Sequence, residues 1–225
     1  MSSVDPRFRY EARREAAPAV VAALGVLVVL SIVSRVEGWE VLHRVHWWAW
    51  LVLALPEVVL LVDFLFGGSL VRTRRVALAL LGVLVVGNLV GLAILVAGLV
   101  STNTSQLSGG ELLLTGSAIW ITNVIVFGLW YWEIDDGGPV ARARHSRTKP
   151  DFQFSQDENP GLAREGWGPQ VWDYLYVSLT NSIAFSPTDA MPLTRHAKAS
   201  MALGSVISVV AVLLVAARAV NVLGA

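Results

Sequence analysis

Five long apolar blocks dominate the chain, and shorter polar segments separate them. The blocks cover residues 18–33, 47–66, 76–100, 111–132 and 198–223. An α-helix rises 1.5 Å per residue, so about 20 residues cross the hydrocarbon core of a bilayer. The pattern therefore predicts five transmembrane helices.

A sixth stretch, residues 171–189, is too short and too polar to be a span of the same kind. Its first half carries Trp172, Leu175, Tyr176 and Leu179 at helical spacing, and its second half is a polar turn that leads into the last apolar block. We interpret this stretch as a re-entrant half-helix, which enters and leaves the membrane on one side. Non-helical backbone at membrane depth is tolerated only where protein buries it or where it lines water.

Two other interpretations of this stretch stay open at the level of sequence. Residues 186–189, SPTD, also make a good helix start, with a serine cap, proline at the first position and a carboxylate at the third. Residues 171–185 would then form an amphipathic helix at the membrane surface. Alternatively, residues 171–186 cross the membrane as a short sixth span, which would move Arg195 and Lys198 to the opposite side.

Composition supports the membrane class and excludes several others. Hydrophobic residues make up 55% of the 225 residues and charged residues 15%, and the mean hydropathy is +0.60. The formal net charge is zero, so no overall field attracts nucleic acid. Cysteine is absent, which excludes disulfides, thiolate metal sites and cysteine nucleophiles. We predict an all-α integral membrane helical bundle with about five transmembrane helices and one re-entrant half-helix.

This interpretation divides the chain into four parts. Residues 1–17 form a polar, basic, cytoplasmic N-terminus, and residues 18–132 form a bundle of four transmembrane helices. Residues 133–170 are a hydrophilic cytoplasmic connection, in which Phe152, Phe154 and Trp167 suggest contact with the membrane surface. Residues 171–225 hold the re-entrant, pore-like helix and the last transmembrane helix.

The basic residues predict the orientation in the membrane. They gather in the N-terminus, at residues 72–75 and 142–149, and at Arg195 and Lys198, whereas the connections 34–46 and 101–110 have few. Because cytoplasmic loops are enriched in Lys and Arg, we expect a multi-pass protein of the cell membrane with a cytoplasmic N-terminus. The re-entrant interpretation then places the C-terminus outside. The basic cytoplasmic loops are expected to contact anionic lipid.

The polar turn offers candidate chemistry, because ion-selectivity filters are built from carbonyl and hydroxyl oxygens that replace an ion's hydration shell. The oxygen-bearing residues of this turn are Thr180, Asn181, Ser182, Ser186, Thr188 and Asp189. One such loop cannot surround an ion path by itself. We therefore expect a homo-oligomer, for which a ring of four is the simplest form.

The C-terminal quarter of the chain resembles the pore-helix, filter and inner-helix segment of tetrameric cation channels. The similarity rests on YLYVSLT at residues 174–180, the turn to Asp189, MPLTR at residues 191–195 and the glycine-bearing last block. Residues 183–187, IAFSP, replace the two filter glycines and the aromatic residue of potassium channels, and Asp189 matches their closing acid. The expected orientation is similar to the cytoplasm-facing pore loop of glutamate-receptor channels.

A second resemblance covers more of the chain. The order of the spans, the turn from Ser178-Leu179-Thr180 to Asp189 and the ending AVN at residues 219–221 resemble an uncharacterised family of bacterial multi-spanning membrane proteins, known only as a domain of unknown function. This resemblance implies a bacterial inner-membrane protein and supplies no activity.

Other residues inside the blocks are candidates for packing or ion binding. Small residues at four-residue spacing indicate either close helix contacts or a pore wall, and they are Gly87 and Gly91, then Ser200, Gly204 and Ser208. Charged residues are costly in lipid unless they face protein or water, and the blocks hold Glu57, Asp63 and Arg218. Glu57 lies near mid-membrane beside Pro56, whereas Asp63 is close to the end of its block. Asn88 lies between the two glycines.

These features favour a homo-oligomeric, pore-loop cation channel. It is not voltage-gated, because the fourth block has no arginine repeat. An ion-coupled transporter of small solutes is the first alternative, with Glu57, Asp63 and Asn88 as ion ligands, and a non-conducting membrane adaptor is the second. We expect no enzyme and no nucleic-acid partner, and no cofactor beyond a bound monovalent cation, because no catalytic, phosphate-binding or nucleic-acid motif is found.

Overall fold

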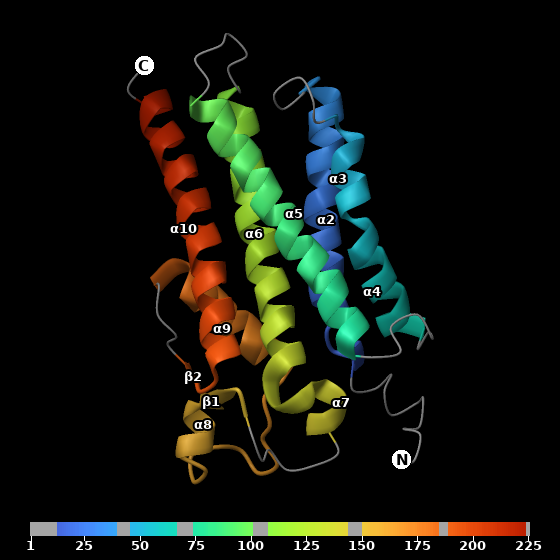
Figure 1. The fold of residues 1–225 in the computed structure, drawn as a ribbon, viewed down its shortest axis with the longest axis vertical. Coiled ribbons are helices and arrows are strands. Elements are labelled where there is room, and N and C mark those ends of the chain that lie inside the picture. Colours follow the sequence, from blue (N-terminus) through green and yellow to red (C-terminus); the bar gives the residue numbers. More distant parts are fainter. Residues whose placement is uncertain are drawn as a thin grey trace.

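The computed structural model describes residues 13–39, 46–66, 74–100, 108–143, 150–184 and 189–223, without the side chains of residues 66, 99, 100 and 218–223. Five helices of the described residues are long and apolar enough to cross a membrane. They are α2 (Ala17–Val36), the pair α3 (Trp48–Leu53) and α4 (Leu55–Phe66), α5 (Arg74–Val100), α6 (Gly109–Ile134) and α10 (Arg195–Leu223). They run side by side as one bundle (Figure 1). The prediction of an all-α membrane bundle with about five spans is confirmed.

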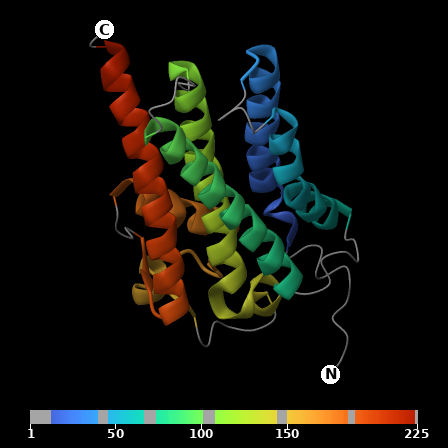
Figure 2. The same cartoon turned by 45° about the horizontal axis from the view of Figure 1, so that its top comes forward.

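The two ends of the bundle differ. The short elements gather at one end, which we call the sheet end, and the opposite end is the far end (Figures 1 and 2). The helix α2 begins at the sheet end, and the following spans alternate in direction, so that α10 ends at the far end. The short elements are η1 (Asp135–Gly137), α7 (Pro139–Arg142), β1 (Phe152–Phe154), α8 (Ser155–Glu158), α9 (Val171–Ala184) and β2 (Ala190–Pro192).

The second span bends where α3 meets α4. Proline has no backbone N–H and its ring crowds the carbonyl four residues earlier, so Pro56 interrupts the hydrogen-bond ladder of the helix. Ala54, which joins the two helices, is not part of either. The bend lies one turn from Glu57.

The helix α6 is the centre of the bundle, because α2, α5, α9 and α10 all pack against it. Glycines on α6 permit the closest approaches. A Cβ atom at Gly116 would lie 2.8 Å from Cγ2 of Val215 in α10, and a Cβ atom at Gly128 would lie 3.0 Å from the Cα atom of Leu175 in α9. These glycines therefore set how near α9 and α10 come to the central helix.

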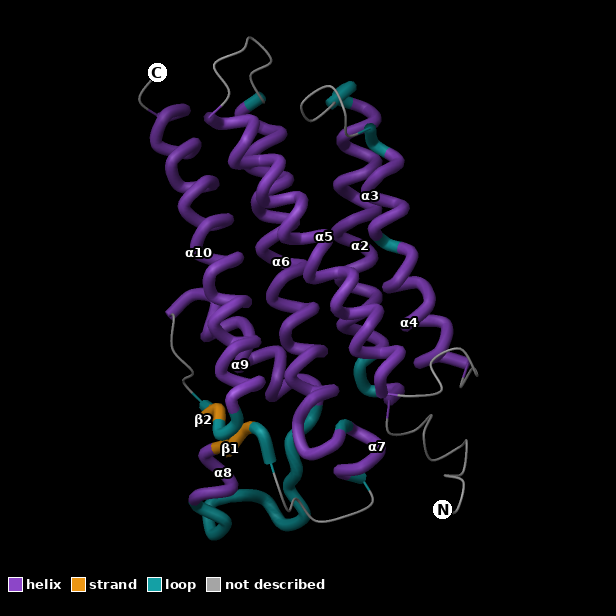
Figure 3. The backbone as a smooth tube through the Cα atoms, in the orientation of Figure 1, coloured by secondary structure: helices purple, strands orange, loops and turns teal. Residues whose placement is uncertain are grey.

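The strands β1 and β2 were not predicted from the sequence. They form a small antiparallel sheet in which Phe152 is opposite Pro192 and Phe154 is opposite Ala190 (Figure 3). The expected contact of Phe152 and Phe154 with the membrane surface is wrong, since both side chains are completely buried. Their rings pack against Tyr131 and Tyr174 at centroid separations of 5.2–6.2 Å. Burial against other aromatic rings stabilises them within the protein.

Candidate functional site

The helix α9 starts at the sheet end and points into the bundle, and the strand β2 that follows it lies at the sheet end again. The 14 residues of α9 span about 21 Å, too short to cross a hydrocarbon core of about 30 Å. At the start of α9, the Tyr174 hydroxyl donates a hydrogen bond to Asp135 at the sheet end. After α9 the chain returns to β2 at the same end (Figure 1). We call the described residues 171–184 and 189–192 the α9 hairpin.

The α9 hairpin reaches about half-way into the bundle. The Asn181 side chain donates a hydrogen bond of 3.0 Å to the carbonyl of Met201, and the Ser205 hydroxyl donates one of 3.3 Å to the Asn181 carbonyl. Met201 and Ser205 lie about 9 and 15 Å along α10 from its first residue. Asn181 is therefore a polar contact at an intermediate depth between α9 and α10.

The residues predicted to line a pore are distributed over different environments. Asn181 and Ser182 are buried, and the Ser182 hydroxyl donates to the Leu179 carbonyl of its own helix. Thr180 is partly exposed and donates to carbonyls of its own helix. Asp189 lies at the sheet end, where its carboxylate accepts a hydrogen bond of 2.8 Å from Ser155. Ser186 and Thr188 lie outside the described residues.

The small residues of α5 and α10 lie at helix contacts. Gly204 faces the Phe127 ring, where a Cβ atom would lie 3.1 Å from the ring, and Ser208 is completely buried. Gly87 faces Leu53 and Gly91 faces Ile119. In contrast, the Ser200 hydroxyl donates to the Ala197 carbonyl of its own helix and is only partly buried.

Buried polar groups form a layer near the middle of the bundle. The Asn123 amide of α6 donates hydrogen bonds of 3.0 Å to the Gly204 carbonyl and 2.8 Å to the Ser208 hydroxyl. The Thr122 hydroxyl donates to Oδ1 of Asn88 in α5 at 3.1 Å. Counted along their helices, Asn88, Asn123 and Ser208 lie about 16–21 Å from the sheet end. We call Asn88, Thr122, Asn123, Asn181, Gly204 and Ser208 the mid-depth layer.

This layer is not fully satisfied by hydrogen bonds. Nδ2 of Asn88 and Oδ1 of Asn123 are buried without a partner among the described residues. A buried polar atom that lacks a partner costs about 1–3 kcal/mol. The layer therefore has spare capacity to bind a donor or an acceptor.

The intramembrane acids differ in their surroundings. Glu57 is buried at mid-depth, and neither carboxyl oxygen has a hydrogen-bond partner among the described residues. Asp63 is buried closer to the sheet end of α4. Arg218 belongs to α10, but its side chain lies outside the described side chains.

Asp135 fixes the start of the α9 hairpin at the sheet end. Its completely buried carboxylate accepts three hydrogen bonds, from the backbone N–H groups of Asp151 and Phe152 at 2.6 and 3.1 Å and from the Tyr174 hydroxyl at 2.5 Å. It therefore joins the end of α6, the strand β1 and the helix α9 through a single side chain.

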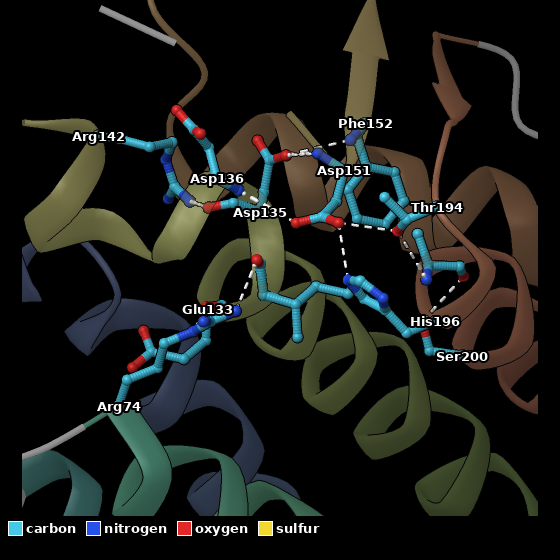
Figure 4. Close-up of polar contacts among 12 residues, drawn as sticks. Arg74, Glu133, Asp135, Asp136, Arg142, Asp151, Phe152, Thr194, His196 and Ser200 are labelled. Carbon is cyan, nitrogen blue, oxygen red and sulfur yellow. Dashed lines mark hydrogen bonds and ion pairs between the residues drawn. The ribbon is translucent and has the colours of Figure 1, made fainter. Parts of the chain in front are cut away.

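Asp151 fixes the end of the hairpin in the same way. Its Oδ1 atom accepts a hydrogen bond from the Thr194 hydroxyl at 2.8 Å and lies 2.7 Å from Nε2 of His196, with which it can form an ion pair. The Asp151 carbonyl accepts a hydrogen bond from the Leu193 N–H at 2.8 Å (Figure 4). The helix α10 begins directly afterwards, at Arg195. These contacts leave both aspartates fully engaged, so we assign them a structural role.

Two arginines cover the carbonyl groups that end α6. Arg74 donates to the carbonyls of Glu133 and Ile134 at 2.8 and 2.7 Å, and Arg142 donates to those of Trp132 and Asp135 at 2.7 and 2.6 Å. The last carbonyls of a helix have no partner within it and carry a partial negative charge. The two guanidinium groups therefore stabilise the end of the central helix.

Sequence reasoning did not single out Asn123, Thr122 or Asp151. For Asn123 a signal existed, since an amide inside an apolar span is costly unless it faces another polar group. For Asp151 no local signal exists, because its partners Thr194 and His196 are more than 40 residues away in the chain. No group of three His, Asp or Glu side chains able to hold a metal ion occurs within the described residues.

Comparisons with known proteins give no information about the function of this chain. The chain matches no protein-family model, no curated protein and no solved structure. The two resemblances drawn from the sequence stay predictions.

Proposed function

We propose that this protein moves a small cation across the membrane, along the mid-depth layer that the α9 hairpin helps to form. The observation that carries the proposal is the depth of Asn181, which a half-helix brings into the interior of the bundle. Channels and transporters place polar groups near the bilayer midplane with such interrupted helices. A protein that only anchors a partner has no need for this arrangement.

The burial pattern favours a path inside one chain over a path between copies. Asn181 and Ser182 are covered by the chain's own helices. The outward face of α9 is apolar instead, with Trp172, Tyr176 and Ile183 exposed by 59%, 50% and 59%. Apolar side chains suit lipid or another subunit, and they are poor ligands for an ion. The proposed path therefore runs between α6, α9 and α10.

Two serines of α10 allow a matched test of this proposal. The Ser208 hydroxyl belongs to the mid-depth layer, whereas the Ser200 hydroxyl bonds only within its own helix. With purified protein in liposomes, we expect uptake of a monovalent cation or a proton, a several-fold decrease for Ser208→Ala and no change for Ser200→Ala. Absence of flux from correctly folded, monodisperse wild-type protein contradicts the proposal and favours the adaptor.

A pore on the axis of a homo-oligomer is the second candidate. The observation in its favour is the same apolar face of α9, which a neighbouring copy is able to cover, together with the partly exposed Thr180 beside it. It predicts a stable oligomer in native mass measurements and a flux that changes in Thr180→Val. A monomer that conducts, with Thr180→Val equal to wild type, rejects the axial pore and retains the path within one chain.

A further inference from the structure

Glu57 carries a carboxyl group that is buried in the middle of the bundle. The residue is 2% exposed, and both side-chain oxygens are buried without a hydrogen bond among the described residues. It lies nine residues before the end of α4, and therefore about 14 Å from the sheet end of that helix. Glu57 is therefore slightly closer to the sheet end than Asn88, Asn123 and Ser208 of the mid-depth layer.

The helices that pack against α4 offer no positive charge at this depth. They are α2, α3 and α5, and their basic residues are Arg35 at the far end of α2 and Arg74 and Arg75 at the sheet end of α5. The titratable side chains of α6 are also near its ends: Glu111 is its third residue, Tyr131 lies three residues before its end, and Glu133 is paired with Arg13 at 2.5 Å. Asp63 on α4 is an acid itself. An unpaired carboxylate inside a protein costs several kcal/mol, so the charged form is strongly disfavoured.

A proton fits this site better than a metal ion does. A cation such as Na⁺ or Ca²⁺ requires several oxygen ligands, whereas a proton requires one carboxyl oxygen. Glu57 belongs to no cluster of three His, Asp or Glu side chains within the described residues. The proton would be bound to one of the two carboxyl oxygens of Glu57.

A small cavity lies one helical turn from Glu57, on the side toward the sheet end. It has a volume of about 10 Å³ and lies between α4, α5 and α6, where Leu60, Leu81 and Glu133 contribute to its wall. Leu60 is on the turn of α4 that follows Glu57. Oε2 of Glu133 is buried without a partner. The cavity is about the size of one water molecule, and Glu133 is the charged residue in a wall that is otherwise mostly apolar.

We propose that Glu57 is a proton-binding site, which carries its proton at neutral pH and exchanges it with the sheet end through the cavity beside Glu133. The inference rests on the proposed function in one respect. The proton of Glu57 is either the cation that the protein transports or the ion whose movement drives the transport of another cation. The binding of the proton itself is tested without any measurement of transport.

Infrared spectroscopy of the full-length protein in nanodiscs tests the site directly. A protonated carboxyl group has a C=O stretching band that shifts when water is replaced by D₂O. We expect such a band at neutral pH, its loss in Glu57→Gln, and its retention in the control Glu37→Gln, which changes an exposed acid at the end of α2. A band that is unchanged in Glu57→Gln, or no band at all, overturns the proposal.

A second measurement uses the wild-type protein and so does not depend on the folding of a variant. Dicyclohexylcarbodiimide reacts with protonated carboxyl groups in apolar surroundings, and we expect mass spectrometry to locate the adduct at Glu57. Ala77 lines the cavity, so Ala77→Val should slow the D₂O shift of the Glu57 band several-fold. Labelling elsewhere with Glu57 unmodified overturns the site, and an unchanged rate of exchange overturns the route. If both tests succeed but the protein transports no ion, the proton-binding site is supported and the proposed transport function is contradicted.

Discussion

At the scale of single residues, the fully buried Asp135 carboxylate accepts hydrogen bonds from Asp151, Phe152 and Tyr174. Removal of one donor should be measurable. Tyr174→Phe leaves a charged acceptor with one bond fewer, and hydrogen bonds to charged groups contribute about 1.5–3 kcal/mol. We expect a loss of this size in the free energy of unfolding, measured by denaturant unfolding in detergent. Tyr176→Phe is the control, because Tyr176 is half exposed on the same helix and should change stability by less than about 0.5 kcal/mol. Equal effects of the two substitutions would contradict the role of Asp135.

Glu15, which lies outside the transmembrane helices, makes the stability of the folded state depend on pH. Burial raises the pKa of this carboxyl above its ordinary value, although the hydrogen bond from the Trp132 indole and the charge of Arg142 act in the opposite direction. The folded state then binds the proton more tightly than the unfolded state, so stability decreases as the pH rises from the ordinary carboxyl pKa through the raised one. Glutamine keeps an acceptor for Trp132 without the charge. Glu15→Gln should therefore unfold at a higher temperature than wild type at pH 7, and the gain should shrink toward pH 4. A gain that grows on acidification would contradict this assignment.

At the scale of elements, the position of α9 depends on one glycine of α6. A Cβ atom at Gly128 would lie 2.6 Å from a methyl carbon of Leu175 and 3.0 Å from its Cα atom, so α9 has to shift in Gly128→Ala. Such overpacking typically costs about 1–3 kcal/mol. We expect this destabilisation together with faster hydrogen exchange of the α9 amides. Gly25→Ala is the control, because a Cβ atom there meets nothing within 4 Å and alanine favours helix. Unchanged exchange in α9 would mean that the contact with Gly128 does not hold it.

The elements also mark the limit of what the sequence predicts. The five spans follow from local apolar blocks, and a half-helix at residues 171–184 follows from its length and polarity. The pairing of β1 with β2 joins residues about 40 positions apart, and no local pattern in Phe152-Gln153-Phe154 specifies it. The helix start proposed at Ser186 was similarly a local inference. The helix α10 begins at Arg195 instead, directly after Thr194, whose hydroxyl donates a hydrogen bond to Asp151.

The mid-depth layer could be predicted only in part. Asn181, Gly204 and Ser208 were recognised as polar or small residues in the right segments. The contacts of Gly204 and Ser208 with Asn123 depend on how α6 and α10 are rotated toward each other. Apolar residues surround both helices, so the sequence does not fix this rotation. The absence of a partner for Glu57 is likewise a property of the packed bundle, since the sequence alone is compatible with a pair.

At the scale of the whole molecule, charge separates the two ends of the bundle. The exposed basic side chains of the sheet end include Arg14, Arg75, Arg195 and Lys198, whereas the far end has Arg35 and, near the end of α10, Arg218 among the described residues. The positive-inside rule predicts that the sheet end faces the cytoplasm. The proton route from Glu57 through the cavity beside Glu133 would then open to the cytoplasmic side.

The absence of cysteine makes this orientation testable without background labelling. Gly161 is exposed at the sheet end and Glu37 is exposed at the end of α2, at the far end. In intact cells, a membrane-impermeant maleimide should label Glu37→Cys, and it should label Gly161→Cys only after the membrane is permeabilised. The wild-type protein, which lacks cysteine, is the control for both. The reverse pattern would place the sheet end outside. The cavity beside Glu133 would then connect Glu57 with the external solution, and the direction of proton supply to this site would be inverted.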